Sequence, residues 1–145
     1  MKNVHEWNND YASYHINKIN KVIHWICIPL IMFSLLGLLS ILSFQFMAVF
    51  IVLALLYYLK LSKSLALGML LISLFFTSII NQITFLSKQN LTILYSTIFI
   101  IAWIGQFTGH KIEGEKPAFF KDLQFLLIGP LWLLSFIYNK LNIKI

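Results

Sequence analysis

The stretch KVIHWICIPLIMFSLLGLLSIL, residues 21–42, decides the fold of this chain of 145 residues. It contains no acidic residue and, after Lys21, no lysine. About 20 apolar residues in a helix rising ~1.5 Å per residue cross the ~30 Å hydrocarbon core of a bilayer. The stretch therefore predicts a transmembrane helix with Asn20 as its N-cap. Pro29 predicts a kink, because proline removes a backbone hydrogen bond.

Further apolar stretches extend this prediction to the rest of the chain. Residues 44–59, 64–86 and about 91–107 each predict a transmembrane helix. Residues 123–138 are interrupted by Gly129 and Pro130, so this segment either spans with a kink or re-enters from one side. We expect an all-α integral membrane protein with a single membrane-embedded domain, residues 1–145. It would contain four transmembrane helices, an N-terminal amphipathic helix and a kinked or re-entrant C-terminal fifth segment.

Composition and charge agree with a membrane protein. Hydrophobic residues make up 59% and charged residues 11%, whereas a soluble domain has about 25% charged residues. The net charge of +6 comes from lysine without arginine. Eight lysines fall on the predicted N-terminal side and Lys88 falls on the other side, while Lys140 and Lys144 keep this bias if residues 123–138 re-enter and break it if they span. The eight are Lys2, Lys18, Lys21, Lys60, Lys63, Lys111, Lys116 and Lys121.

This lysine bias predicts a cytoplasmic N-terminus. In a membrane protein, basic charge indicates orientation and anionic lipid rather than nucleic acid, so we expect no nucleic-acid partner. The use of lysine without arginine, with abundant isoleucine and asparagine, favours an AT-rich genome. It therefore favours a bacterial inner membrane over the endoplasmic reticulum.

The N-terminal segment has an aromatic stripe. Val4, Trp7, Tyr11 and Tyr14 recur at three- and four-residue spacing, which is typical of one face of a helix. We expect a short amphipathic helix in the headgroup region or across the cytoplasmic mouth of the bundle.

Three of the four histidines fall at one predicted membrane interface. His15 and His24 flank the start of the first span, and His110 follows the fourth. A helix break within residues 17–20 would let His15 and His24 converge, because asparagine side chains cap and turn the backbone. Glu113, one helical turn after His110, could be a further ligand or could orient the imidazole. Each histidine alone is equally compatible with a polar residue at a helix end, but together they predict a metal site.

Two motifs contain these histidines. Tyr-His-x-Asn-x-x-Asn-x-x-Ile-His-x-x-x-x-Pro occupies residues 14–29, and Gln-Phe-x-Gly-His occupies residues 106–110, followed by Glu113 and Lys-Pro-Ala at 116–118. A later Leu-Leu-Ile-Gly-Pro occupies residues 126–130. In this order and separation, over nearly the whole chain, the motifs resemble those of the 2-hydroxy fatty acid dioxygenase family.

The resemblance implies a small multispanning enzyme of lipid metabolism. Members use iron(II) and O₂ to shorten 2-hydroxy fatty acids by one carbon (α-oxidation), a reaction that serves phytosphingosine degradation in fungi. It implies that His15, His24 and His110 carry the iron and that Glu113 is the next catalytic candidate. The segment from His110 to the following proline is one residue shorter than in fungal members. The middle of the chain also lacks the further histidine that fungal members carry, and His5 lies outside both motifs.

The residue types suit this chemistry. Imidazoles bind ferrous iron, and open coordination positions can hold O₂ and a substrate together. A 2-hydroxy acid presents two oxygens on adjacent carbons, while its acyl chain can lie between helices or in membrane lipid. We expect Tyr14, Asn20 and Lys116 to contact the substrate. Two alternatives stay open. A b-type haem protein would show an intense visible absorption band, and a non-catalytic lipid-binding scaffold would contain no metal.

Overall fold

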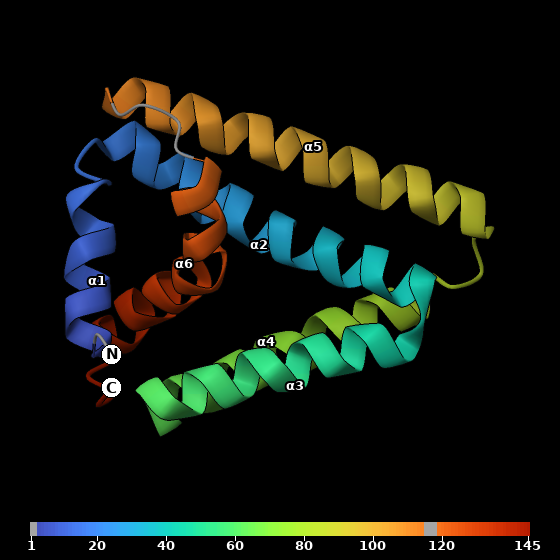
Figure 1. The fold of residues 1–145 in the computed structure, drawn as a ribbon, viewed down its shortest axis with the longest axis horizontal. Helices are drawn as coiled ribbons and strands as arrows, with labels where there is room; N and C mark the ends of the chain where they lie inside the picture. The colour runs from blue at the N-terminus through green and yellow to red at the C-terminus, as the bar shows by residue number, and fades with distance from the viewer. Residues whose placement is uncertain (1–2, 115–118) are drawn as a thin grey trace.

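The computed structural model describes residues 3–114 and 119–145, and the side chains among these except those of residues 119–125. All regular secondary structure in these residues is helical, as Figure 1 shows. The helices are α1 (Val4–Ser13), α2 (Lys18–Leu42), α3 (Phe44–Leu61), α4 (Lys63–Gln82), α5 (Lys88–Glu113) and α6 (Phe119–Lys140). The prediction of an all-α fold is confirmed.

Helices α2 to α5 are long and apolar enough to cross a membrane. Their outer faces expose large apolar side chains, such as Leu53 and Ile101, each 61% exposed. In a membrane, lipid tails surround such side chains. On a soluble protein, an exposed apolar surface of this extent would cause association or aggregation. The four predicted transmembrane helices are confirmed, and the fold is that of an integral membrane protein.

Three predicted helix boundaries are wrong by several residues. Helix α4 ends at Gln82, earlier than predicted, and α5 begins at Lys88, where the Ser87 hydroxyl accepts a hydrogen bond from the backbone of Asn90. At its other end α5 continues to Glu113 rather than stopping near residue 107. Gly114 then ends it with φ of 84°, a left-handed conformation that glycine adopts without strain.

The connection between α1 and α2 also differs from its prediction. Asn17, not Asn20, is the N-cap of α2, since its side chain accepts from the backbone of Ile19. The break lies between Tyr14 and Asn17 rather than within residues 17–20. Asn20 is fully buried inside the first turns of α2. Helix α2 continues through Pro29 as one helix.

Helices α1 and α6 close one end of the bundle. Val4 of α1 is buried in a cluster with Leu131 and Leu134 of α6, and Tyr11 in a cluster with Ile128 and Leu133. In Figure 1, α6 bends midway and returns toward the end of the bundle where both termini lie. The fifth segment is therefore kinked and re-entrant in shape rather than a straight crossing.

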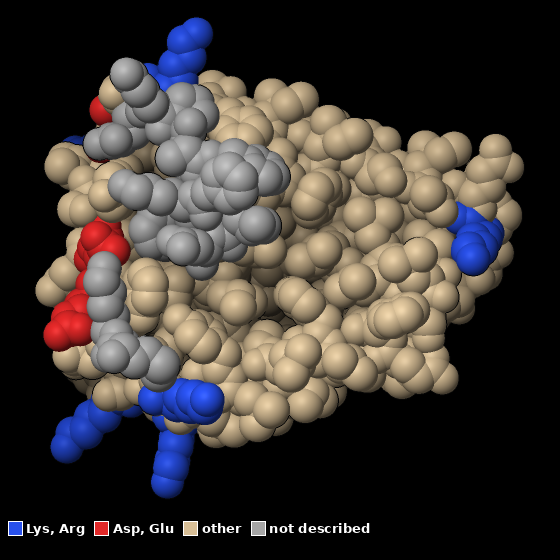
Figure 2. Space-filling view, in the orientation of Figure 1, with Lys and Arg blue, Asp and Glu red and all other residues tan. Residues whose placement is uncertain are grey.

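The charged side chains gather at the same end. On the face shown in Figure 2, the red and most of the blue atoms lie at the end carrying the termini, and the surface over the helices is almost entirely tan. This distribution agrees with the lysine bias of the sequence. The cytoplasmic orientation of this end and the choice of membrane stay predictions.

Candidate metal centre

Helices α2 and α5 pack closely at the charged end because small residues of α5 face α2. A Cβ atom added at Gly105 would lie 2.5 Å from Sγ of Cys27. One added at Gly109 would overlap Oδ1 of Asn20 and lie 3.2 Å from Cε1 of His24. Small residues are the usual means by which membrane helices approach each other closely. Here they bring the histidine of α5 next to that of α2.

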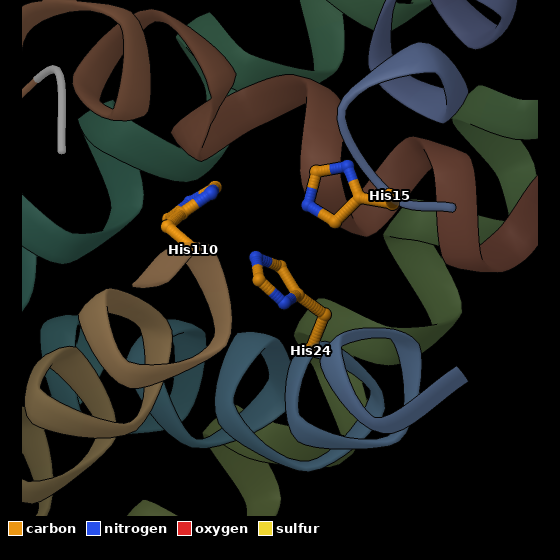
Figure 3. Close-up of side chains that lie close together, drawn as sticks. All are labelled: His15, His24 and His110. Carbon is orange, nitrogen blue, oxygen red and sulfur yellow. The ribbon is translucent and has the colours of Figure 1, made fainter. Parts of the chain in front are cut away.

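The structure brings the three predicted histidines together. His15 lies in the connection after α1, His24 in the second turn of α2 and His110 in the last turn of α5. Figure 3 shows their rings turned toward one another. One nitrogen from each ring lies within 4.8 Å of the others, a geometry in which a single metal ion could be held. All three side chains are buried, with exposures of 1%, 1% and 9%.

Backbone hydrogen bonds orient two of the rings. Nδ1 of His15 donates to the carbonyl of Tyr11 at 2.7 Å, and Nδ1 of His24 donates to the carbonyl of Asn20 at 2.9 Å. A carbonyl can only accept, so each Nδ1 carries the proton and each Nε2 carries the lone pair. Proteins commonly fix metal-binding histidines in this way.

Aromatic rings hold His15 in place from the side. The Tyr11 ring stacks on it, with centroids 4.2 Å apart and planes within 8°. Trp132 of α6 lies 5.6 Å from the His15 ring and 5.2 Å from Tyr11. Tyr11 of α1 and Trp132 of α6 therefore position the one histidine of this chain that does not lie in a helix.

The Glu113 carboxylate fastens the end of α5 to the α1–α2 connection. It accepts hydrogen bonds from the backbone N–H groups of Ile16 (2.8 Å) and Asn17 (3.0 Å) and from Nδ2 of Asn20 (2.8 Å). Hydrogen bonds to a charged group each contribute about 1.5–3 kcal/mol. Glu113 thus stabilises the position of the backbone next to His15, which is a long-range contact that sequence spacing did not indicate.

Replacing Glu113 by glutamine should weaken the site without abolishing it. Glutamine keeps the size of the side chain but has a single acceptor oxygen and no charge, so the α1–α2 connection loosens. We expect metal affinity to fall roughly 10- to 100-fold, the usual effect of losing a group that supports a ligand. Titration of the metal-free protein with iron(II) measures this.

The matched control is Glu6→Gln, because the Glu6 carboxylate also accepts a backbone hydrogen bond at a helix start, from Asn3, but away from the histidines. Complete loss of metal in Glu113→Gln would instead indicate a direct ligand. Unchanged affinity would show that this contact does not support the site.

The other predicted site residues lie as follows. Asn20 donates from Nδ2 to Glu113 and, at 3.4 Å, to the carbonyl of Tyr14, so its amide is engaged within the protein. The Tyr14 side chain is partly exposed at the end of α1, and His5 is exposed on α1, outside the cluster. Lys116 lies outside the described residues. Contact of Tyr14, Asn20 and Lys116 with substrate stays a prediction.

A pocket opens beside the histidines. Its free volume is about 30 Å³, and His24 and His110 form part of its wall. Gln106, one turn before His110 and buried, lines the same pocket, as do Trp103 and Tyr11. Gln106 stood in the second motif without a predicted role. Its four-residue spacing from His110 was the available signal, because this spacing puts both side chains on one helix face.

These features define a class: multispanning helical membrane proteins with a buried cluster of three histidines beside an apolar pocket. Comparison with known proteins gives the family. Residues 1–141 match the family described as 2-hydroxy-palmitic acid dioxygenase Mpo1-like, and the chain belongs to it. It is 35% identical over 140 residues to the 2-hydroxy-palmitic acid dioxygenase MPO1 of Saccharomyces cerevisiae, covering 91% of this chain and 78% of the yeast protein. No solved structure matches the chain.

Proposed function

We propose that this protein is an iron(II)-dependent dioxygenase that converts a 2-hydroxy fatty acid to the fatty acid one carbon shorter. The observation that carries the proposal is the cluster of three buried histidines on the wall of a largely apolar pocket. The relationship to a yeast 2-hydroxy-palmitic acid dioxygenase supports the substrate class. With O₂ as oxidant, the atom balance closes when the carboxyl carbon leaves as CO₂ and water is formed.

His15, His24 and His110 would hold the iron. The ring nitrogens fit this role. In His15 and His24, Nδ1 is bonded to a backbone carbonyl, so Nε2 would be the ligand atom. One nitrogen of His110 lies within 4.8 Å of a ligand nitrogen of each of these two rings. Three neutral imidazoles suit ferrous iron and leave further coordination positions open. Bound iron would supply the activation of O₂ that this oxidation requires.

The remaining residues of the pocket would bind and orient the acid. The Gln106 amide can donate a hydrogen bond to a carboxylate oxygen at the wall shared with His24 and His110. Ile28, Ile31 and Met32 line the pocket and would receive the first carbons of the chain. These apolar walls exclude water from the reacting end, which strengthens each polar contact there. Lysines at the charged end of the bundle would attract the anionic substrate.

The arrangement suits a mononuclear site better than a haem. The three histidine rings lie edge to face. The ring centroids are 4.2 Å apart for His15 and His24, 5.0 Å for His24 and His110, and 5.6 Å for His15 and His110. A b-type haem needs a flat slot between two facing imidazoles.

Aerobic incubation of the purified, iron(II)-loaded protein with 2-hydroxypalmitic acid tests the proposal. We expect pentadecanoic acid to accumulate, measured by mass spectrometry, and we expect no product from palmitic acid, which lacks the hydroxyl group. The loaded protein should show no intense haem absorption. If the metal-loaded protein forms no shortened acid, the proposed reaction is wrong, and an intense haem band would favour the cytochrome alternative.

A further inference from the structure

A second pocket lies deeper in the bundle, enclosed by α2, α3, α4 and α6. We call it the inner pocket. Its free volume is about 30 Å³, and none of the described residues that line it is charged. The hydroxyl of Tyr58, on its wall, donates to the carbonyl of Leu127 at 2.8 Å. A pocket with almost only apolar surface fits an apolar ligand.

The inner pocket adjoins the histidine pocket. Met32 of α2 and Leu126 and Pro130 of α6 line both. Pro130 lies inside α6, and its presence in the walls of both pockets puts it between the two spaces. A molecule with its polar head at the histidines therefore meets the inner pocket directly past these three residues.

The two pockets together have the depth of a long acyl chain. Along α2, the two pockets together extend from His24 to Leu36. These residues are twelve positions apart, so the helix between them is about 18 Å long. Along α3, the inner pocket extends from Tyr58 to Phe50, which is about 12 Å. One leaflet of acyl chains fills about 15 Å, half of the ~30 Å hydrocarbon core.

The far end of the inner pocket is closed by packed side chains. Leu36, 2% exposed, belongs to a buried cluster against which Phe50 and Ile51 pack. Ser73 of α4, which is also buried, completes this end. Because these walls are fixed by the helix packing, a chain of greater length would have to displace them.

We propose that the inner pocket widens to hold the acyl tail of the substrate and that its closed end limits the tail length. The assignment rests on the proposed function for the identity of the head group at the histidines. A third pocket, with a free volume of about 120 Å³, also reaches Met32 and Pro130 but is lined by Ile137, which is 39% exposed toward the outside of the bundle. An acyl tail in the inner pocket would stay inside the bundle, whereas a tail in the third pocket would point outward to lipid.

The first test changes the length of the inner pocket. Ala54→Phe places a ring midway along it, and Leu53→Phe places the same ring on the outer face as the matched control. We expect Ala54→Phe to reduce turnover of 2-hydroxypalmitic acid at least about tenfold while turnover of 2-hydroxyoctanoic acid is retained. Leu53→Phe should change neither. Phe50→Ala should shift the preference toward acids longer than 2-hydroxypalmitic acid, because it opens the closed end.

The second test needs no turnover. A 2-hydroxy fatty acid with a diazirine at its terminal carbon is photolysed with the metal-free protein in lipid nanodiscs. We expect crosslinks near Leu36, Phe50 or Ser73 that unlabelled 2-hydroxypalmitic acid suppresses. Crosslinks near Trp25 and Ile137, or an unchanged chain-length profile in both pocket variants, would overturn the assignment.

The two proposals fail in different ways. Shortened acid together with crosslinks elsewhere would reject the tail site and leave the proposed reaction intact. Crosslinks in the inner pocket without any shortened acid from iron-loaded protein would reject the reaction and leave an acyl-binding site.

Discussion

His24→Ala is expected to remove most of the bound metal and essentially all activity while the protein still inserts and folds. The imidazole is 1% exposed, and its Nδ1 is anchored to the carbonyl of Asn20. Alanine supplies no ligand atom, and two remaining imidazoles hold a metal far less tightly than three. We expect metal affinity to fall by more than the roughly 100-fold that loss of a supporting group can cause. Metal content by mass spectrometry and product formation measure the two effects.

His5→Ala is the matched control for this experiment. His5 is exposed on α1 and lies outside the cluster, so its removal should change neither metal content nor turnover. Full turnover in His24→Ala would show that the ligand assignment is wrong. Equal losses in both variants would point to a general effect of histidine removal rather than to this site.

Gly109→Val is expected to weaken both the packing of α5 on α2 and the metal site. Even the Cβ of alanine would overlap Oδ1 of Asn20 and lie 3.3 Å from Nδ1 of His24. The Asn20 and His24 side chains must then shift, or helix α5 must move away from α2, and either change disturbs the spacing of His110 and His24. Overpacking of this kind costs about 1–3 kcal/mol of stability. The distance change should lower metal affinity at least about tenfold, because ligand positions must hold within about 0.5 Å.

Thr108→Leu tests whether added bulk alone explains such a loss. Thr108 is the neighbouring residue and is exposed, so the larger side chain meets the surroundings of the bundle rather than α2. Thermal unfolding and iron(II) titration of both variants give the comparison. If Gly109→Val kept wild-type stability and affinity, close approach of the two helices would not be what forms the site.

Local patterns were sufficient to predict the spanning helices and the amphipathic α1. The apolar stretches are long, and the stripe of Val4 and Tyr11 does face the core. These features depend on periodicity and length, which are properties of neighbouring residues. Placement of His15, His24 and His110 at one end followed from counting the spans between them.

Features that depend on distant contacts could not be predicted in this way. Asn17 and Asn20 are equally good N-caps by residue type, whereas the distant residue Glu113 bonds the Asn20 side chain and the backbone of Asn17. Similarly, Gly109 has low helix propensity, yet α5 continues through it because the absent side chain allows packing on α2. No local sequence pattern predicts the pockets, because their walls are formed by residues of separate helices.

The separation of the histidines along the chain has a consequence for biogenesis. His15 precedes the first transmembrane helix, His24 lies within it, and His110 ends the fourth. During synthesis from the N-terminus, the first two side chains are in the membrane region long before the third is made. A metal held by all three can therefore be acquired only after the last spanning helix has inserted and docked beside the first. Any fragment released earlier would contain two of the imidazoles and no complete site.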